Sequence, residues 1–175
     1  MSVFVAVELS HVVREAVERV IDGHRAITAK WQRGEKLHLT LVFLGNPTAE
    51  QVSSFTPRID ELASRHAPFS LQVEGAGRFE TMRAPTVLWL GVGGALEPLR
   101  QLQAALATAL GVVATQPYVP HITLARAQDA HAFDAAMPAL EQVKSESFLV
   151  EHVTLFESTH HQYRALHRSA LGHTN

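Results

Sequence analysis

The chain repeats one order of predicted elements, and this repeat limits the folds open to it more than any other feature. Hydrophobic periodicity predicts a first copy of strand (Val3–Leu9), helix (12–21), strand (Lys36–Leu44), helix (48–64) and strand (Phe69–Glu74). It predicts a second copy of strand (Thr86–Val92), helix (96–110), strand (Tyr118–Arg126), helix (Ala130–Val143) and strand (Ser147–Phe156). We therefore expect one domain, residues 1–175, with similar lobes over about 1–80 and 84–158 and a C-terminal strand and tail over 159–175.

Residues at the ends of these elements add local predictions. Ser10 is expected to cap the first helix, and Thr48 with Gln51 has the pattern of a capping box. The glycines of 75–77 predict a turn, and Pro138 is expected to kink or break the helix that contains it. Residues 162–170 are predicted to form a last strand.

The third element of each copy carries the same short motif, His38-Leu-Thr-Leu41 in the first and His121-Ile-Thr-Leu124 in the second. Alternate residues of a strand share a face, so His38 and Thr40 point one way, as do His121 and Thr123. Two lobes related by an approximate two-fold axis would bring these four side chains into one cleft. There the imidazoles could act as general acid and general base, and the hydroxyls could bind an oxyanion.

This set of groups suits attack by water on a phosphodiester. In-line displacement places the attacking and leaving oxygens on opposite sides of phosphorus. One histidine can remove the water proton while the other protonates the departing alkoxide, because an unperturbed pKa near ~6.5 leaves both forms available around neutral pH. No metal is required, since the acid stabilises the leaving group.

A third segment, His152-Val-Thr-Leu155, has the same pattern. It falls in the fifth element of the second copy, where the first copy has no histidine. The spacing agrees for the other two, because Val3 to His38 spans 35 residues and Val87 to His121 spans 34. We therefore predict that His152 lies outside the site.

Composition limits the classes of function. The 175 residues are 46% hydrophobic and 18% charged, which is typical of a globular protein, and the net charge of −2 gives no global field for nucleic acid. RNA binding would need a local basic patch, which Lys30, Arg33 and Lys36 could supply, although a solvated face explains them equally well. The chain has no cysteine, lacks the basic start of a signal peptide and has no apolar run long enough to span a membrane. We expect a cytoplasmic monomer.

The motifs and their flanks resemble the two-histidine (2H) phosphoesterase superfamily, and within it the RNA 2′,3′-cyclic phosphodiesterases, also called 2′-5′ RNA ligases. The stretches that carry the resemblance are Phe4–Leu9, Trp31 with Leu37–Gly45, Val87–Val92, Pro120–Arg126 and Val153–Ser158. They are spread over nearly the whole chain, from Phe4 to Ser158, in the order that the family has them.

The resemblance implies an α+β fold of two pseudo-symmetric lobes of mainly antiparallel sheet, with outer helices and a central active-site groove. It implies hydrolysis of RNA 2′,3′-cyclic phosphate ends to 2′-phosphate without a cofactor, and reversible joining of tRNA halves through a 2′-5′ bond. It assigns His38 as proton donor, His121 as proton acceptor, and Thr40 and Thr123 to phosphate binding.

The sequence departs from the family pattern beside these motifs. Lys30 and Thr86 stand where relatives often have arginine. Lysine carries the charge but lacks the planar fork of arginine, so the grip on substrate is expected to differ.

Other candidate residues have two readings each. Arg126 could contact substrate phosphate or form a surface ion pair, and Trp31 and Tyr118 could stack a base or pack in the core. Core packing is favoured for Phe43. Arg78 and Arg83 lie in a loop flanked by Gly and Pro and could bind RNA or face solvent.

The C-terminal histidines, His160, His161, His167 and His173, match no common metal-ligand spacing, so an exposed tail is expected.

Two alternatives to RNA-end hydrolysis remain at this point. One is an RNA-end-binding module without catalysis. The intact His/Thr pairs argue against it, because a site that only binds phosphate favours Arg or Lys. The other is a phosphodiesterase for a small cyclic phosphate, such as a small cyclic nucleotide, or for a 2′-5′ oligoadenylate.

Overall fold

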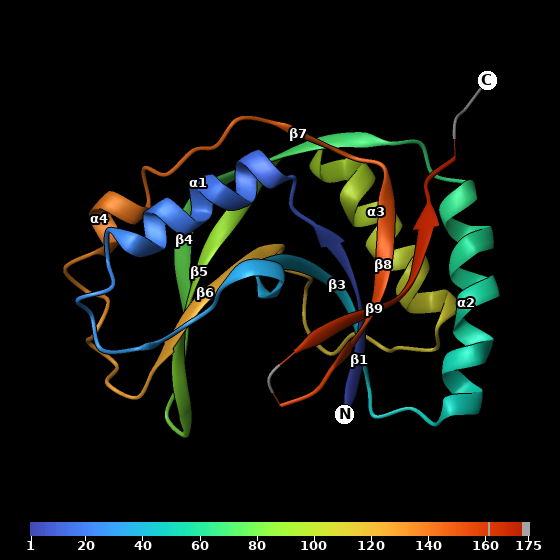
Figure 1. The fold of residues 1–175 in the computed structure, drawn as a ribbon, viewed down its shortest axis with the longest axis horizontal. Helices are drawn as coiled ribbons and strands as arrows, with labels where there is room; N and C mark the ends of the chain where they lie inside the picture. Colours follow the sequence, from blue (N-terminus) through green and yellow to red (C-terminus); the bar gives the residue numbers. More distant parts are fainter. Residues whose placement is uncertain (161, 173–175) are drawn as a thin grey trace.

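The structure, a computed structural model, describes residues 1–160 and 162–172. Its elements are β1 (Ser2–Glu8), α1 (His11–Asp22), β2 (Lys30–Trp31), the 3₁₀ turn η1 (Gly34–Lys36), β3 (His38–Gly45), α2 (Ala49–Ser64), β4 (Phe69–Thr81), β5 (Ala84–Gly94), α3 (Leu96–Ala109), β6 (His121–Ala127), α4 (Met137–Leu140), β7 (Phe148–Val150), β8 (His152–Ser158) and β9 (Tyr163–Ala170). They form an α+β fold of two antiparallel sheets with helices packed around them, as the sequence predicted (Figure 1).

The two halves of the chain exchange strands. One sheet has the order β3-β1-β8-β9 and the other has the order β2-β6-β5-β4-β7. The fifth strand of the first copy, β4, therefore pairs with β5 of the second copy, and β8 of the second copy pairs with β1 of the first. Figure 1 shows this as green β4 beside β5 and orange β8 beside blue β1. Each sheet is thus built from both halves of the sequence.

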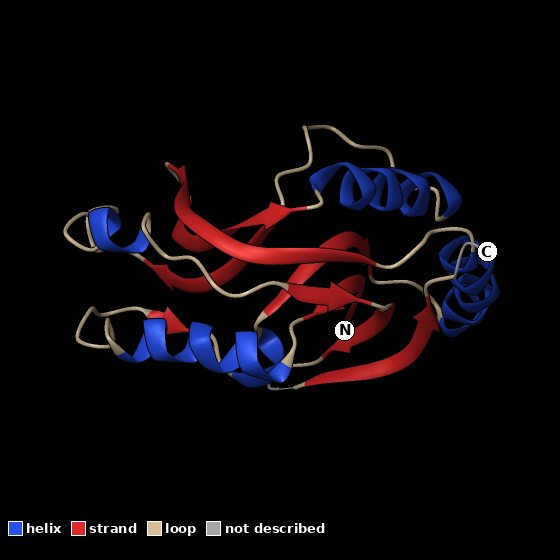
Figure 2. Cartoon of the chain, turned by 90° about the horizontal axis from the view of Figure 1, so that it is seen from above, coloured by secondary structure: helices blue, strands red, loops and turns tan. Residues whose placement is uncertain are grey.

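The helices lie at the outside of this pair of sheets. α1 runs along the five-stranded sheet, while α2 and α3 contact each other beside the four-stranded sheet (Figures 1 and 2). The predicted caps are confirmed: the Ser10 hydroxyl accepts from the Val13 amide at 3.3 Å, and Thr48 and Gln51 form a reciprocal capping box. No helix in the described ranges has the length and apolar character needed to span a bilayer.

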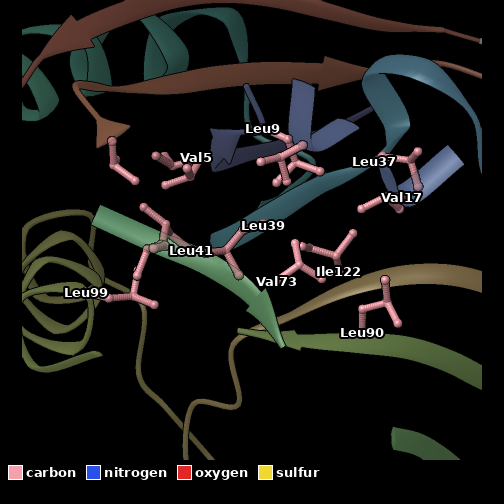
Figure 3. Packing of buried hydrophobic residues seen from close by; sticks show 14 of the residues in the cluster. Val5, Leu9, Val17, Leu37, Leu39, Leu41, Val73, Leu90, Leu99 and Ile122 are labelled. Atoms are coloured by element: carbon pink, nitrogen blue, oxygen red, sulfur yellow. The ribbon is translucent and has the colours of Figure 1, made fainter. Parts of the chain in front are cut away.

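The core fills the space between the sheets. Leu39 of β3 and Ile122 of β6 are each 1% exposed, and Figure 3 shows them meeting side chains from β1, β4, β5 and α1. Burying each of these side chains contributes about 1.5–3 kcal/mol. Because Leu39 and Ile122 are held in the core, their strand neighbours point to the opposite face, and that face carries the histidines.

Three predicted elements differ from the observed ones. β4 does not end at the 75–77 glycines but continues to Thr81, since Gly75 adopts a φ of 75° and the strand accommodates it with a register shift. The helix expected over Ala130–Val143 is wrong; only Met137–Leu140 is helical, and Pro138 lies at its start, where the missing amide costs nothing.

The strand expected over Ser147–Phe156 is two strands, β7 and β8, which join different sheets. The predicted last strand is confirmed as β9. β2, only two residues long, was not predicted; it pairs with β6 and brings Lys30 opposite Arg126.

Candidate active site

The two motif strands line one cavity. His38 and Thr40 enter it from β3, His121 and Thr123 from β6, and these strands contact each other where the sheets meet. The cavity has a volume of about 300 Å³, and its remaining lining consists of Ser2, Phe4, Gln32, Lys36, Phe43, Arg126, Ser158 and Tyr163. None of the described residues that line it is acidic. A protein of net negative charge thus has a locally cationic cavity suited to an anion.

Both motif strands contain the same irregularity just after the threonine. In β3 the register with β1 shifts between the pairs Ala6↔Thr40 and Val5↔Val42, and in β6 the register with β5 shifts between Trp89↔Thr123 and Leu88↔Ala125. Such a bulge reverses the alternation of the residues beyond it. The fifth residue after each histidine, Phe43 in one strand and Arg126 in the other, therefore faces the cavity.

Two predictions are decided by these bulges. The expectation that Phe43 packs in the core is wrong, because its side chain lines the cavity and is 59% exposed. Arg126 lies in the cavity wall and forms no ion pair within residues 1–160 and 162–172. The surface ion-pair reading of Arg126 therefore has no support in the described structure.

His38 is held on both ring nitrogens and on its ring face. Its Nδ1 donates to the Lys36 carbonyl at 2.9 Å, and its Nε2 lies 2.9 Å from the Thr40 hydroxyl. The Phe4 ring stacks on the imidazole at 4.9 Å between centroids, with Tyr163 edge-on at 5.4 Å. Burial lowers the pKa of His38 to about 4, opposed by the Lys36 carbonyl and assisted by the charge of His121.

His121 has the corresponding backbone contact but different ring neighbours. Its Nδ1 donates to the Val119 carbonyl at 2.7 Å, again two residues upstream. Phe79 of β4 contacts the ring edge-on at 4.9 Å, and Trp89 of β5 lies 5.9 Å away. Burial lowers the pKa of His121, opposed by the Val119 carbonyl and assisted by Arg126.

Gly77 of β4 makes room for the Trp89 indole that contacts His121. A Cβ at Gly77 would stand 2.3 Å from Cζ2 of Trp89, so only glycine lets the indole lie across β4. Because Trp89 contacts His121, the glycine controls the position of the histidine indirectly.

The third His-x-Thr segment binds a carboxylate outside the cavity. The Glu8 side chain accepts from His152 Nε2 at 3.0 Å, from the Thr154 hydroxyl at 2.9 Å, and from Arg168 at 3.0 and 2.9 Å. These donors hold the pKa of Glu8 well below its usual range, with His152 contributing most. His152 does not line the cavity, and its contacts describe a structural cluster.

Trp31 and Tyr118, the candidates for base stacking, are both engaged elsewhere. Trp31 packs edge-on against Phe133 and donates its indole N–H to the Ile27 carbonyl at 3.2 Å. The Tyr118 hydroxyl donates to the Thr40 carbonyl at 2.8 Å, and burial raises its pKa. Neither ring lines the cavity.

The candidate basic residues separate in space. Lys36 lines the cavity, with Nζ 5.7 Å from the Tyr163 ring centroid, whereas Lys30 and Arg33 lie outside it. The expected loop position of Arg78 is wrong, because Arg78 lies in β4, where it pairs with Asp134 and with Glu80. Arg83 is exposed in the turn between β4 and β5.

Sequence reasoning missed Tyr163 and Phe79, which contact the two histidines. Phe79 lies in the part of β4 that the glycines made look like a turn, and Tyr163 follows the last matching stretch of the family. Neither position carries a local signal.

The C-terminal histidines are only partly an exposed tail. His167 lies in β9, and its Nε2 contacts Asp60 of α2 at 2.8 Å. His161 and His173 lie outside the described residues. Within 1–160 and 162–172, no group of three or more His, Cys, Asp or Glu side chains is placed to hold a metal ion.

Comparison with known proteins identifies the family. The profile of the 2′-5′ RNA ligase superfamily matches residues 11–162. The chain belongs to this superfamily. Its relatives include two RNA 2′,3′-cyclic phosphodiesterases. The protein of Aquifex aeolicus is 30% identical over 70% of this chain and 69% of that protein. The protein of Methanothermobacter thermautotrophicus is 29% identical over 89% of this chain and 88% of that protein.

Solved structures agree with the fold over nearly the whole chain. E. coli LigT complexed with 3′-AMP is 28% identical, with a TM-score of 0.77 and 97% of each chain covered. A Thermus thermophilus protein is 27% identical, with a TM-score of 0.76 and 99% and 100% covered. The resemblance inferred from the motifs and their flanks is therefore confirmed.

Proposed function

We propose that this protein hydrolyses RNA 2′,3′-cyclic phosphate ends to 2′-phosphates without a metal, using His38 as acid and His121 as base. The observation that carries the proposal is a cavity, lined by no Asp or Glu among the described residues, into which two histidines project from equivalent positions of two strands. Membership of the 2′-5′ RNA ligase superfamily supports the same reaction.

The backbone carbonyls fix the tautomer of each imidazole and so determine which ring nitrogen reacts. A carbonyl only accepts, so Nδ1 of His38 and Nδ1 of His121 both carry hydrogen. Nε2 is then the atom that exchanges a proton with substrate in each ring. His121 Nε2 takes the proton of the attacking water, and the protonated Nε2 of His38 gives one to the departing 3′ oxygen.

Protonation of His38 is coupled to phosphate binding through Thr40. In neutral His38, Nε2 is an acceptor, and the Thr40 hydroxyl donates to it. Once Nε2 is protonated it no longer accepts, so the Thr40 hydroxyl hydrogen is released to a phosphate oxygen and the Nε2 proton is available to the departing 3′ oxygen. The anion and the acid proton therefore stabilise each other, which offsets the low pKa of His38 in the empty cavity.

The remaining cavity groups bind the developing charge. Thr123 occupies the position in β6 that Thr40 occupies in β3 and supplies a second hydroxyl donor. Arg126 and Lys36 bring two cations to the wall. Thr40, Thr123, Arg126 and Lys36 together stabilise the negative charge of the pentavalent transition state.

The same groups can join RNA ends, because the displacement of the 3′ oxygen is the same for a different attacking oxygen. If the 5′ hydroxyl of a second RNA takes the place of water, attack on the cyclic phosphate forms a 2′-5′ bond. Reversible joining of tRNA halves is therefore part of the proposal, with RNA ends as the partner.

A substrate panel tests the proposal. Purified protein in EDTA is incubated with a 2′,3′-cyclic nucleotide and with cyclic-ended RNA, and products are scored as 2′- or 3′-phosphate. We expect 2′-phosphate, with turnover abolished in His38→Ala and in His121→Ala. His152→Ala is the matched control and should retain most activity.

The panel also separates the alternatives. Binding of cyclic-ended RNA without product would indicate an end-binding module. Turnover of a small cyclic phosphate that is insensitive to salt, with none of RNA, would indicate a small-molecule phosphodiesterase. No hydrolysis of any substrate would refute the proposal.

A further inference from the structure

A second hollow opens beside the catalytic cavity and shares Arg126 with it. Its volume is about 930 Å³, against about 300 Å³ for the catalytic cavity. Ligand sites in proteins typically enclose ~300–1,000 Å³. The catalytic cavity lies at the lower end of this range, so a substrate longer than one nucleotide must continue outside it, and Arg126 marks the shared wall.

The hollow has an apolar floor and a polar rim. Ala29, Pro85 and Ala132 are half-buried and small or flat, so they leave room for a planar ring. Gln128 and Asp129 are exposed at the rim. Together they provide amide donors and carboxylate acceptors of the kind that read the edge of a base.

Two cations stand where the hollow meets the catalytic cavity. Lys30 of β2 is the register partner of Arg126 in β6, so both side chains leave the same face of the sheet. Within the described ranges neither forms an ion pair, and both are exposed. Their charges are available to a phosphate that passes between the two cavities.

We propose that this hollow binds the nucleotide preceding the cyclic-phosphate end of an RNA substrate. The inference rests on the proposed function and narrows its substrate class to RNA of at least two nucleotides. The terminal nucleotide occupies the catalytic cavity, and the internucleotide phosphate lies against Arg126 and Lys30. The preceding base packs on the floor formed by Ala29, Pro85 and Ala132. Sites for single-stranded nucleic acid commonly combine a cationic path with aromatic side chains that stack on the bases; here the cations are present and the packing surface is aliphatic.

The test compares adenosine 2′,3′-cyclic phosphate with the dinucleotide ApA ending in a 2′,3′-cyclic phosphate. The wild-type protein should have a kcat/KM about tenfold or more higher for the dinucleotide. Ala132→Phe fills the hollow and should remove this preference while leaving mononucleotide hydrolysis within about twofold. Ala135→Phe, at an exposed position of the same turn, is the matched control and should keep the preference.

Lys30→Gln provides a second variant that does not depend on packing. It should lower kcat/KM for the dinucleotide and reduce the salt dependence of its binding by about one charge. Equal rates on the two substrates in the wild-type protein would overturn the inference and leave the proposed function intact. An equal loss on both substrates in Ala132→Phe, at unchanged melting temperature, would also overturn it. Absence of hydrolysis of either substrate would instead refute the proposed function.

Discussion

His38 is expected to make the fold sensitive to acid. Its pKa is about 4 in the folded protein because burial disfavours the imidazolium, whereas an exposed histidine of the unfolded chain has a pKa near ~6.5. Over the interval between these values the unfolded chain binds the proton more readily. Stability therefore falls as the pH falls from about 6.5 to about 4.

The magnitude follows from the two pKa values. The contribution of His38 is a loss of about 2 kcal/mol at pH 5 and close to none at pH 7. Replacing His38 by Gln removes the titrating group and keeps a polar side chain of similar reach. Urea unfolding of both proteins at pH 7 and pH 5 should show a loss in the wild type that exceeds the loss in the variant by about 2 kcal/mol.

Sulfate provides an independent test of the same prediction, because it stays a dianion between pH 5 and pH 7 and fits a site for tetrahedral anions. If Thr40 couples the proton of His38 to an anion, sulfate should stabilise the wild-type protein more at pH 5 than at pH 7. The excess should be smaller in His38→Gln. Equal pH dependence of the two proteins, or a His38 resonance that titrates near ~6.5 by NMR in the free protein, would show that burial does not control this group.

Three further substitutions test the surroundings of the site. Glu8→Gln should lower the stability by about 2 kcal/mol and the melting temperature by about 4–8 °C, with little change in kcat below the transition; a lost kcat at unchanged melting temperature would contradict the structural role. Gly77→Ala should displace Trp89 and reduce kcat about tenfold or more, since misplacement of a catalytic group by about 1 Å has large effects; an unchanged kcat would show that the indole does not position the histidine. Tyr118→Phe removes the hydrogen bond to the Thr40 carbonyl and should lower stability by about 1 kcal/mol in thermal unfolding, and an unaltered stability would mean that this bond contributes nothing net.

The motif strands were predictable because two signals agree in them: the alternation of apolar and polar residues, and the similar distance of each histidine from the first strand of its copy. Leu39 and Ile122 are apolar at alternate positions and lie in the core, which leaves His38 and His121 on the other face. The same alternation placed Phe43 wrongly. Its strand carries two buried residues in succession before it, and so does β6 before Arg126. This repeated apolar pair is the signal that would have revealed both bulges.

Pairing between the copies was not predictable from periodicity. A pattern of period 2 shows which residues of a strand share a face but not which strand lies beside it. Phe79 and Tyr163 reach the histidines only through such pairings, because β4 lies next to β5 and β9 next to β8. The helix over Ala130–Val143 failed for another reason: its apolar residues are buried through turns, so burial alone did not require a helix.

The exchange of β4 and β8 also bears on how such a chain could arise. A polypeptide of half this length would lack one of the two neighbours of its first strand, but two identical copies could each lend a final strand to the other. Such a homodimer would present two equivalent imidazoles across its axis, and symmetry would force both into the same environment. Joining the copies in one chain lifts that constraint. One ring can then be enclosed by Phe4 and Tyr163, while the other lies against Phe79 and Trp89 near Arg126. The acid and the base proposed above can thus diverge from a single ancestral residue.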